Sequence, residues 1–271
     1  MNTDAGSNGP KHLRVTPQEA LSRLTAGLDP SRLLLATDFD GTLAEVVANP
    51  DRAAILPEAE RALRRLNGAL GLVAVISGRG TGDLSRRLSI RGLRLLGDYG
   101  LEDPSRSDLD AIAAFAHEIV ELTARPGIRI EVKPASISVH FRDAPEAGPV
   151  LLDELKPLAE RRRLQLRSGR LVAEIMPGSA NKERALSKLI EEVRPGAVVW
   201  CGDDSGDRGC FELVAGLGVP HLAVGVDSPE APPGLFDACD LLVPGPPGNA
   251  ALLSGLAAWA RPDRAGPGSG G

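Results

Sequence analysis

Short apolar runs alternate with amphipathic stretches over the first hundred residues and again after residue 177. The uninterrupted apolar runs predict strands at 33–37, 72–76, 93–96, 197–201, 221–226 and 240–243. Apolar residues recurring every three or four positions predict helices at 16–28, 57–70, 81–88, 182–193, 209–214 and 249–259. Strands that are apolar throughout and separated by helices are typical of a parallel sheet covered on both faces.

The pattern changes between residues 103 and 177. A helix is predicted at 107–124, followed by strands at 128–133 and 136–142. A second helix at 145–162 is followed by strands at 163–167 and 171–175. Ser168-Gly169 is typical of a hairpin turn between the last two strands. Apolar and polar residues alternate along the first strand pair, as in antiparallel sheets with one open face. The predicted fold is α/β: a Rossmann-like parallel sheet core with an inserted α+β cap whose sheet is open-faced.

These patterns also divide the chain into domains. We expect a core of residues 17–102 plus 178–261 and an inserted cap of residues 103–177. Residues 1–16 and 262–271 are polar or rich in glycine and proline, so we expect a disordered leader and a disordered tail.

Composition narrows the function classes. The chain has 271 residues, 42% of them hydrophobic and 25% charged, as in soluble globular proteins. A net charge of −5 and 3% aromatic residues argue against nucleic-acid binding and against attraction to anionic membranes. The apolar runs are far shorter than the roughly 20 residues that cross a bilayer. With three scattered cysteines and no signal-like start, the chain is expected to be cytoplasmic.

Polar clusters follow three of the predicted parallel strands. Asp38 and Asp40 follow the first, Ser77 follows the second, and Asp203 and Asp204 follow the strand at 197–201. Ligands of open α/β sheets bind beyond the carboxyl ends of the strands, so these clusters converge if the strands are neighbours. Crowded carboxylates repel one another unless a cation bridges them. Without histidine or thiolate ligands, the set favours a hard ion such as Mg²⁺.

Such a site suits phosphate esters, because a divalent ion neutralises the charge of the phosphoryl group. Asp38 is the candidate nucleophile, forming an aspartyl-phosphate. Asp40 is the candidate acid and base for the leaving alkoxide and the attacking water. Ser77, Gly78 and Lys182 are candidates for binding the phosphate oxygens.

Four segments in order resemble the motifs of haloacid-dehalogenase-type phosphatases. They are Asp38-Phe39-Asp40-Gly41-Thr42-Leu43, Ser77-Gly78-Arg79, Lys182, and Gly202-Asp203-Asp204 followed by Asp207. Within that superfamily the chain resembles the trehalose 6-phosphate phosphatase family over about residues 33–260. The segments that carry this likeness are Glu131-x-Lys133, His140-Phe141-Arg142, Glu174-Ile175-Met176-Pro177 and Asn181-Lys182.

The resemblance implies a metal site. Mg²⁺ would bind the Asp38 carboxylate, Asp203 and the backbone carbonyl of Asp40. Asp204 and Asp207 would lie nearby and support this site. It also implies an enzyme that acts on a small sugar phosphate. We expect this enzyme to be a monomer. A trehalose-phosphate-synthase-type enzyme upstream would supply this substrate.

The resemblance also implies that cap residues bind the sugar. Glu131, Lys133 and Glu174 would reach its hydroxyl groups. Strand alternation independently places Glu131 with Lys133 on one face, and His140 with Arg142 on one face of the next strand. All five are therefore predicted substrate-binding residues.

Departures from the family pattern leave the substrate open. Asp98-Tyr99-Gly100 stands where Glu-His-Gly is usual, and Met176 stands where arginine is frequent. Both departures lie where the resemblance places the residues that recognise the sugar. Trehalose 6-phosphate is the expected substrate, and sucrose phosphate, a glycosyl-3-phosphoglycerate or a pseudo-disaccharide phosphate are the alternatives. A phosphohexomutase and a non-catalytic partner domain of a synthase are more remote ones.

Overall fold

The computed structural model describes residues 15–47, 49–101, 105–133, 135–169, 171–229 and 231–260. They form two compact units: one from the residues up to Gly97 and from Lys182 onward, the other from Asp98 to Asn181. The predicted leader and tail lie outside the described residues, apart from Val15 and Thr16. Thr16 caps the first helix, since its hydroxyl accepts a hydrogen bond from the Glu19 amide.

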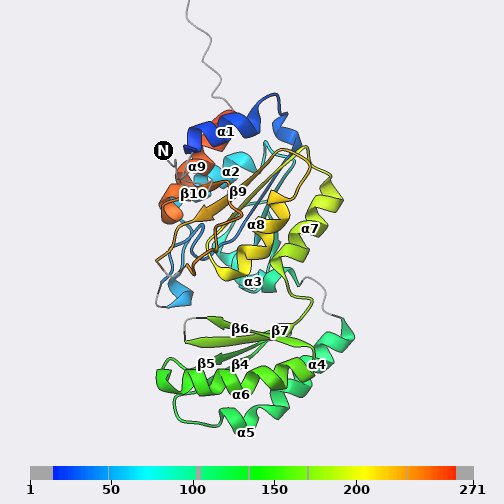
Figure 1. Cartoon of the computed structure of the whole chain (residues 1–271), viewed down its shortest axis with the longest axis vertical. Coiled ribbons are helices and arrows are strands. Elements are labelled where there is room, and N and C mark those ends of the chain that lie inside the picture. The colour runs from blue at the N-terminus through cyan, green and yellow to red at the C-terminus, as the bar shows by residue number, and fades with distance from the viewer. Residues whose placement is uncertain are drawn as a thin grey trace, which may run out of the picture. The chain divides into compact units, whose positions relative to one another are not determined.

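A six-stranded parallel sheet forms the middle of the first unit (Figure 1). Its strands, in spatial order, are β10 (Leu241–Val243), β9 (His221–Val226), β8 (Ala197–Gly202), β1 (Leu33–Thr37), β2 (Leu72–Ile76) and β3 (Arg94–Leu96). Thr37, the last residue of β1, lies opposite Val75 of β2 and Cys201 of β8. The carboxyl ends of these three strands therefore lie at the same edge of the sheet.

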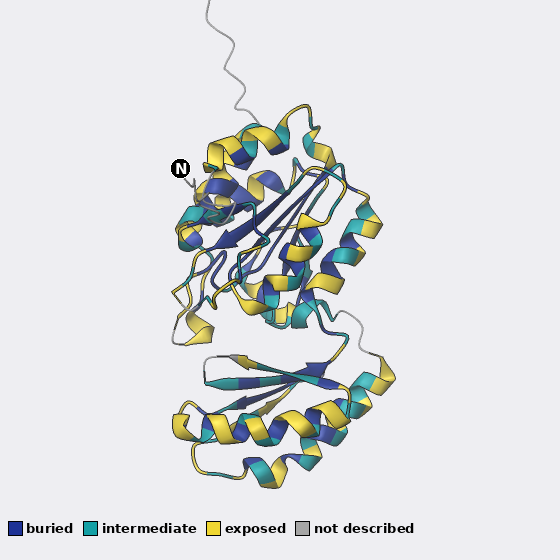
Figure 2. Cartoon of the chain, in the orientation of Figure 1, coloured by how far each residue is buried: buried dark blue, intermediate teal, exposed yellow. Residues whose placement is uncertain are grey.

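Helices cover both faces of this sheet. Leu33 and Leu35 of β1 pack with one group, and Leu34 and Ala36 with the other. The first group is α1 (Pro17–Thr25), α2 (Pro57–Leu66), α3 (Thr81–Arg87) and α9 (Gly245–Ala260); the second is α7 (Lys182–Val193) and α8 (Arg208–Ala215). Buried strands between partly exposed helices are visible in Figure 2. This arrangement explains why the strands lack polar alternation, and it confirms the predicted parallel core.

The second unit carries a four-stranded antiparallel sheet. Its strands, in spatial order, are β4 (Arg129–Val132), β5 (Ile137–His140), β7 (Val172–Pro177) and β6 (Leu164–Gly169). One face packs on α4 (Arg106–Glu118) and α6 (Gly148–Arg161), with α5 (Val120–Thr123) following α4. The other face carries the polar residues of the strands. The predicted fold class, a parallel core with an inserted antiparallel sheet, is confirmed.

Short 3₁₀ turns connect several elements: η2 (Pro30–Arg32), η3 (Pro50–Arg52), η4 (Asp98–Gly100), η5 (Pro145–Ala147) and η6 (Ser205–Asp207). In the described part of the chain, no helix is long and apolar enough to cross a membrane.

Two local predictions are wrong. Ser168 and Gly169 do not form a turn, because they pair with Ala173 and Val172 as part of β6. The reversal comes later, and Leu171 there adopts a left-handed conformation with φ of 58°. The helix expected at 107–124 is divided into α4 and α5.

Candidate active site

Three buried carboxylates meet at the carboxyl edge of the parallel sheet. Asp38 directly follows β1, Asp203 follows β8, and Asp207 ends η6. Each offers a carboxylate oxygen, and these oxygens lie within 4.8 Å of one another. The backbone explains the approach, because the Asp38 amide donates to the carbonyl of Cys201 at the end of β8. The predicted convergence of acidic groups therefore occurs for these three residues.

Lys182 supplies one positive charge to this acidic cluster. It is the first residue of α7, and its side chain is only 2% exposed. Its Nζ lies 2.7 Å from Asp207 Oδ1, 3.1 Å from Asp38 Oδ1 and 3.8 Å from Asp204 Oδ1. Burial alone would lower the pKa of Lys182, but these carboxylates raise it well above its ordinary value. The amine is therefore held in its charged form.

The carboxylates of the cluster carry more negative charge than Lys182 balances. Burial, with repulsion from Asp207, raises the pKa of Asp203 to about 8. Burial raises the pKa of Asp207 to about 6 and that of Asp38 well above its ordinary value, although Lys182 acts in the opposite direction. A divalent cation would remove this conflict. The oxygen donors of Asp38 and Asp203 fit a hard ion such as Mg²⁺.

Asp207 and Asp204 differ in their surroundings. Asp207 Oδ2 accepts from the amides of Asp203 and Asp204 at 2.9 and 3.1 Å, while Oδ1 contacts Lys182. Asp207 therefore fixes the loop after β8. The Asp204 side chain is 58% exposed, and its Oδ1 accepts from the Gly206 amide. The structure does not bring Asp204 into the three-carboxylate cluster.

Gly41 packs closely against Asp203 in this site. Gly41 has φ of +75°, and a Cβ there would lie 2.0 Å from Asp203 Oδ2. Asp203 is also held by Thr42, whose hydroxyl donates to Oδ1 at 2.9 Å. Asn249 of α9 donates to the Thr42 carbonyl at 3.0 Å. Sequence analysis missed these roles of Thr42 and Asn249; only Thr42 lies in a motif.

The Asp40 side chain pairs with Arg79 and is not one of the three clustered carboxylates. Its Oδ2 and Oδ1 accept from Arg79 Nε and Nη2 at 2.6 and 2.7 Å. Sequence analysis included Arg79 in a motif but gave it no role. Ser77 and Gly78 precede it directly after β2, and the buried Ser77 hydroxyl accepts from the Arg79 amide at 3.2 Å. Ser77 thus lies at the same edge of the sheet as Asp38.

The second unit gathers most of its predicted substrate-binding residues on one sheet face. Glu131 pairs with Ser138, and Ser138 with Glu174, so their side chains share a face. His140 lies on that face as well, with Nε2 3.3 Å from Glu131 Oε2. Arg142 lies two residues beyond the end of β5, in the following turn.

Tyr99 and Arg167 join this polar face. The Tyr99 hydroxyl donates to Glu174 Oε2 at 2.5 Å, and the Arg167 guanidinium lies 4.4 Å from the centroid of the Tyr99 ring. Asp98 lies near Lys133 and Glu174: burial raises its pKa, and Lys133 opposes that shift. The polar face is therefore a partly exposed set of mixed charges, unlike the buried acidic cluster.

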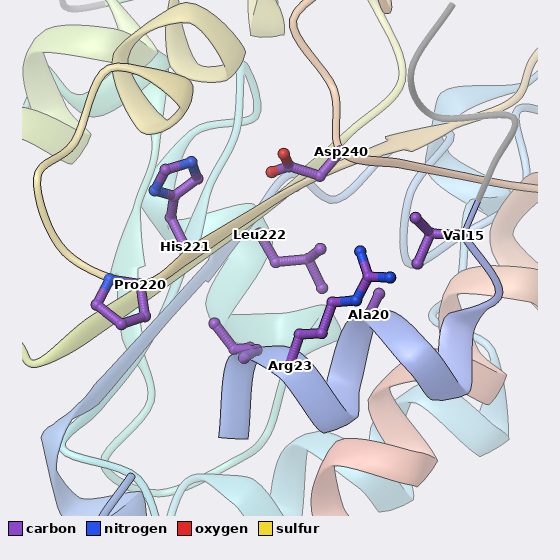
Figure 3. A pocket seen from close by; sticks show the side chains of 8 residues that line it. Val15, Ala20, Arg23, Pro220, His221, Leu222 and Asp240 are labelled. Carbon is purple, nitrogen blue, oxygen red and sulfur yellow. The ribbon is translucent and has the colours of Figure 1, made fainter. Parts of the chain in front are cut away.

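A separate cavity of about 390 Å³ lies in the first unit (Figure 3). Its lining includes His221, the first residue of β9, and Asp240, which directly precedes β10. Arg23 and Leu24 of α1 line it as well. Since β9 and β10 begin there, the cavity lies at the amino edge of the sheet. The acidic cluster lies at the other edge, so this cavity is not part of the candidate active site.

Comparisons with known proteins bear on the family and the fold. A family model described as trehalose-phosphatase matches residues 36–231. A trehalose-phosphate phosphatase of Mycobacterium tuberculosis is 30% identical over 217 residues, which are 73% of this chain and 55% of that protein. A protein of the same organism, named as an uncharacterized glycosyl hydrolase, is 33% identical over 231 residues, 78% of this chain and 17% of that protein.

The chain thus spans about half the length of the first of these relatives and a smaller part of the second. Among solved structures, the C-terminal domain of trehalose-6-phosphate phosphatase from C. albicans has a TM-score of 0.69 and 19% identity. That likeness covers 90% of this chain and 97% of the other, and at this identity it shows a shared fold.

Proposed function

The chain belongs to the trehalose-phosphatase family, and from this premise we propose that it hydrolyses trehalose 6-phosphate to trehalose and inorganic phosphate. One observation carries the chemistry: Asp38, Asp203 and Asp207 form a buried carboxylate cluster around Lys182 at the carboxyl edge of the sheet. A binding module has no need for buried carboxylates that repel one another. This argues against the alternative of a non-catalytic partner domain.

Asp38 is proposed to attack the phosphorus and form an aspartyl-phosphate as the bond to the sugar oxygen breaks. Asp40 gives a proton to the departing alkoxide and then takes one from the water that attacks the same phosphorus. This attack releases phosphate and restores Asp38. Lys182, 3.1 Å from Asp38 Oδ1, offsets negative charge on the transferred group.

Asp38, Asp203 and the Asp40 backbone carbonyl are proposed to hold Mg²⁺. When bound, the ion supplies the positive charge that a buried carboxylate and a phosphate dianion require. Asp207 orients the loop through its two amide contacts, and Asp204 lies at its exposed rim. Ser77 and the Gly78 backbone are proposed to bind the phosphate oxygens.

The polar face of the second unit is proposed to bind the sugar through Glu131, Lys133, His140 and Glu174. Carboxylate oxygens accept hydrogen bonds from hydroxyl groups, and this face offers two such side chains on adjoining strands. Arg142, in the turn after β5, is proposed as a further contact to the substrate.

A second candidate is the same chemistry on another disaccharide or pseudo-disaccharide phosphate. Tyr99 favours it, because its hydroxyl occupies a Glu174 oxygen that a sugar hydroxyl would otherwise use. We also propose a cytoplasmic monomer supplied by a synthase of the trehalose-phosphate type. Cys201, Cys210 and Cys239 are buried free thiols, which suits a reducing compartment.

Phosphate release across a panel of sugar phosphates tests this function. The panel includes trehalose 6-phosphate, sucrose phosphate, a glycosyl-3-phosphoglycerate and glucose 6-phosphate, each with Mg²⁺ and with a chelator. We expect trehalose 6-phosphate to give the highest kcat/KM and the chelator to abolish release. A higher kcat/KM on another sugar phosphate selects the second candidate. Failure to release phosphate from any ester refutes the proposal.

A further inference from the structure

Arg79 is a buried cation outside the acidic cluster, and its side chain is 12% exposed. Nε and Nη2 bind both oxygens of Asp40, and Nη1 donates to Asp83 Oδ2 at 2.9 Å. Nη2 also donates to the Pro50 carbonyl at 3.0 Å, and the guanidinium carbon lies 5.5 Å from the centroid of the Phe39 ring. Contacts on several sides therefore fix the guanidinium.

Asp83 holds Arg79 from helix α3. Partial burial alone would raise the pKa of Asp83, but hydrogen bonds from Arg87 and Arg79 lower it to about 2. The Arg87 Nε donates to Asp83 Oδ2 at 2.8 Å, and its Nη1 donates to the carbonyls of Asp51 and Ala53. The network thus links α3, η3 with the residue after it, and the loop that carries Asp40.

Two parallel hydrogen bonds from one guanidinium fix the plane of a carboxylate, which a lysine cannot do. Arg79 occupies one lone pair on each Asp40 oxygen and leaves the other free. The Asp40 side chain is 39% exposed, so these lone pairs remain accessible. The carboxylate is therefore presented in one orientation rather than rotating freely.

We propose that Arg79 is a positioning residue that aims the Asp40 carboxylate at the group exchanging a proton, and that Asp83 fixes Arg79. The inference rests on the proposed function, in which Asp40 protonates the departing sugar alkoxide. Arg79 itself touches neither the phosphorus nor the nucleophile in this scheme. The contacts of its side chain described above are with Asp40, Asp83, Pro50 and Phe39, and not with Asp38, Asp203 or Lys182.

The leaving group separates this role from a structural one. A sugar alkoxide is a strong base and needs a proton as the bond breaks, whereas 4-nitrophenolate leaves without one. Losing the orientation of Asp40 therefore slows transfer from a sugar phosphate more than transfer from 4-nitrophenyl phosphate. A disturbed fold or phosphate site slows both alike.

The experiment measures release of the leaving group in a single turnover, with enzyme in excess and Mg²⁺ present. This isolates the first step from hydrolysis of the aspartyl-phosphate, which also uses Asp40. We expect Arg79→Lys to slow release of the leaving group from the sugar phosphate at least about tenfold. General acid catalysis typically accelerates a reaction by about 10²- to 10⁴-fold. The rate with 4-nitrophenyl phosphate remains close to that of the wild type.

Asp83→Asn is the second variant, because it loosens Arg79 without altering either partner of the Asp40 pair. We expect the same substrate dependence with a smaller loss, and it carries the test alone if Arg79→Lys does not fold. Arg64→Lys is the control, since Arg64 pairs on the surface of α2 with Glu60; it should leave both rates unchanged.

If the wild type is active, equal losses of rate on both substrates in the variants, or no loss on either, overturn the proposal. A wild type that transfers phosphate from neither substrate refutes the proposed function instead. Thermal unfolding of each variant shows that it is folded before its rates are compared.

Discussion

The acidic cluster of the first unit and the polar face of the second unit are built differently. Asp38, Asp207 and Lys182 are almost fully buried, and backbone amides and neighbouring charges fix them. Glu131 and His140 are more exposed and contact each other across adjoining strands. A buried charged site tolerates few substitutions, because each one leaves an unpaired group in the interior.

The polar face can change with less cost, because water can satisfy its exposed groups. On this basis we expect the proposed catalytic residues to tolerate fewer substitutions than Tyr99, which is partly exposed and departs from the family's pattern. The proposed chemistry and the proposed substrate choice would then depend on regions with different tolerance to substitution. Each of the following experiments tests that contrast.

Asp38→Asn is expected to have the largest effect. It removes the nucleophile, and losses of roughly 10³-fold or more in kcat are typical for such groups. It also removes one of the repelling carboxylates, while Lys182 keeps Asp207 as its partner at 2.7 Å. No charge is left unpaired in the interior, so the metal-free variant should unfold at a temperature no lower than the wild type. Phosphate release and thermal unfolding measure the two effects.

Asp110→Asn is the control for Asp38→Asn, because the Asp110 side chain is 65% exposed on α4. It should leave both kcat and the unfolding temperature unchanged. Turnover by Asp38→Asn near the wild-type rate would contradict the nucleophile assignment.

Gly41→Ala is expected to weaken metal binding. Its Cβ would meet Asp203 Oδ2 at 2.0 Å, so Asp203 must move. Disturbing groups that orient a metal ligand typically costs about 10- to 100-fold in affinity, and we expect a similar rise in the Mg²⁺ concentration for half-maximal activity. Gly27→Ala is the matched control: φ is +68° there as well, but nothing lies within 4 Å of an added Cβ. Equal shifts in both variants would show that backbone strain, not the contact with Asp203, is responsible.

Stabilisation by Mg²⁺ is expected to increase with pH. Burial raises the pKa of Asp203 to about 8 and that of Asp207 to about 6, so the folded metal-free protein retains protons that the unfolded chain releases above about pH 4. Metal-free stability therefore falls as pH rises from about 4 to about 8. A bound Mg²⁺ would take the place of the proton on Asp203.

Unfolding temperatures with Mg²⁺ and with a chelator, at pH 5 and pH 8, measure this difference. We expect a gain of several degrees from Mg²⁺ at pH 8 and a smaller gain at pH 5. Asp203→Asn should lose most of the pH dependence. A gain that does not change with pH would show that the buried carboxylates do not exchange protons for the metal.

The sequence was sufficient to predict where the carboxylates gather. Apolar runs specified the strands, and Asp38 and Asp203 follow two of them directly, so the geometry of a parallel sheet brings them together. The partner of Asp40 could not be predicted in this way. An arginine side chain is long and flexible, and spacing alone does not decide which of several nearby carboxylates it pairs with.

Other details depend on contacts distant in sequence. Asn249 reaches Thr42 across 207 residues, and no local pattern indicates it. Ser168 and Gly169 have turn-forming residue types, but pairing with β7 keeps them extended. For these two residues, tertiary pairing outweighed local preference.

Tyr99→Phe is expected to have the smallest effect and tests the polar face itself. The ring and its contact with Arg167 remain, while the 2.5 Å hydrogen bond to Glu174 is lost. A single hydrogen bond is worth about 0.5–1.5 kcal/mol, so we expect KM for the sugar phosphate to change by about two- to tenfold with kcat unchanged. KM for 4-nitrophenyl phosphate, which carries no sugar, should stay constant. Adding Glu174→Gln should remove the effect, because the two side chains act as a pair. A change in kcat on both substrates would instead place Tyr99 among the groups that support the chemistry, and the contrast between the two regions would fail.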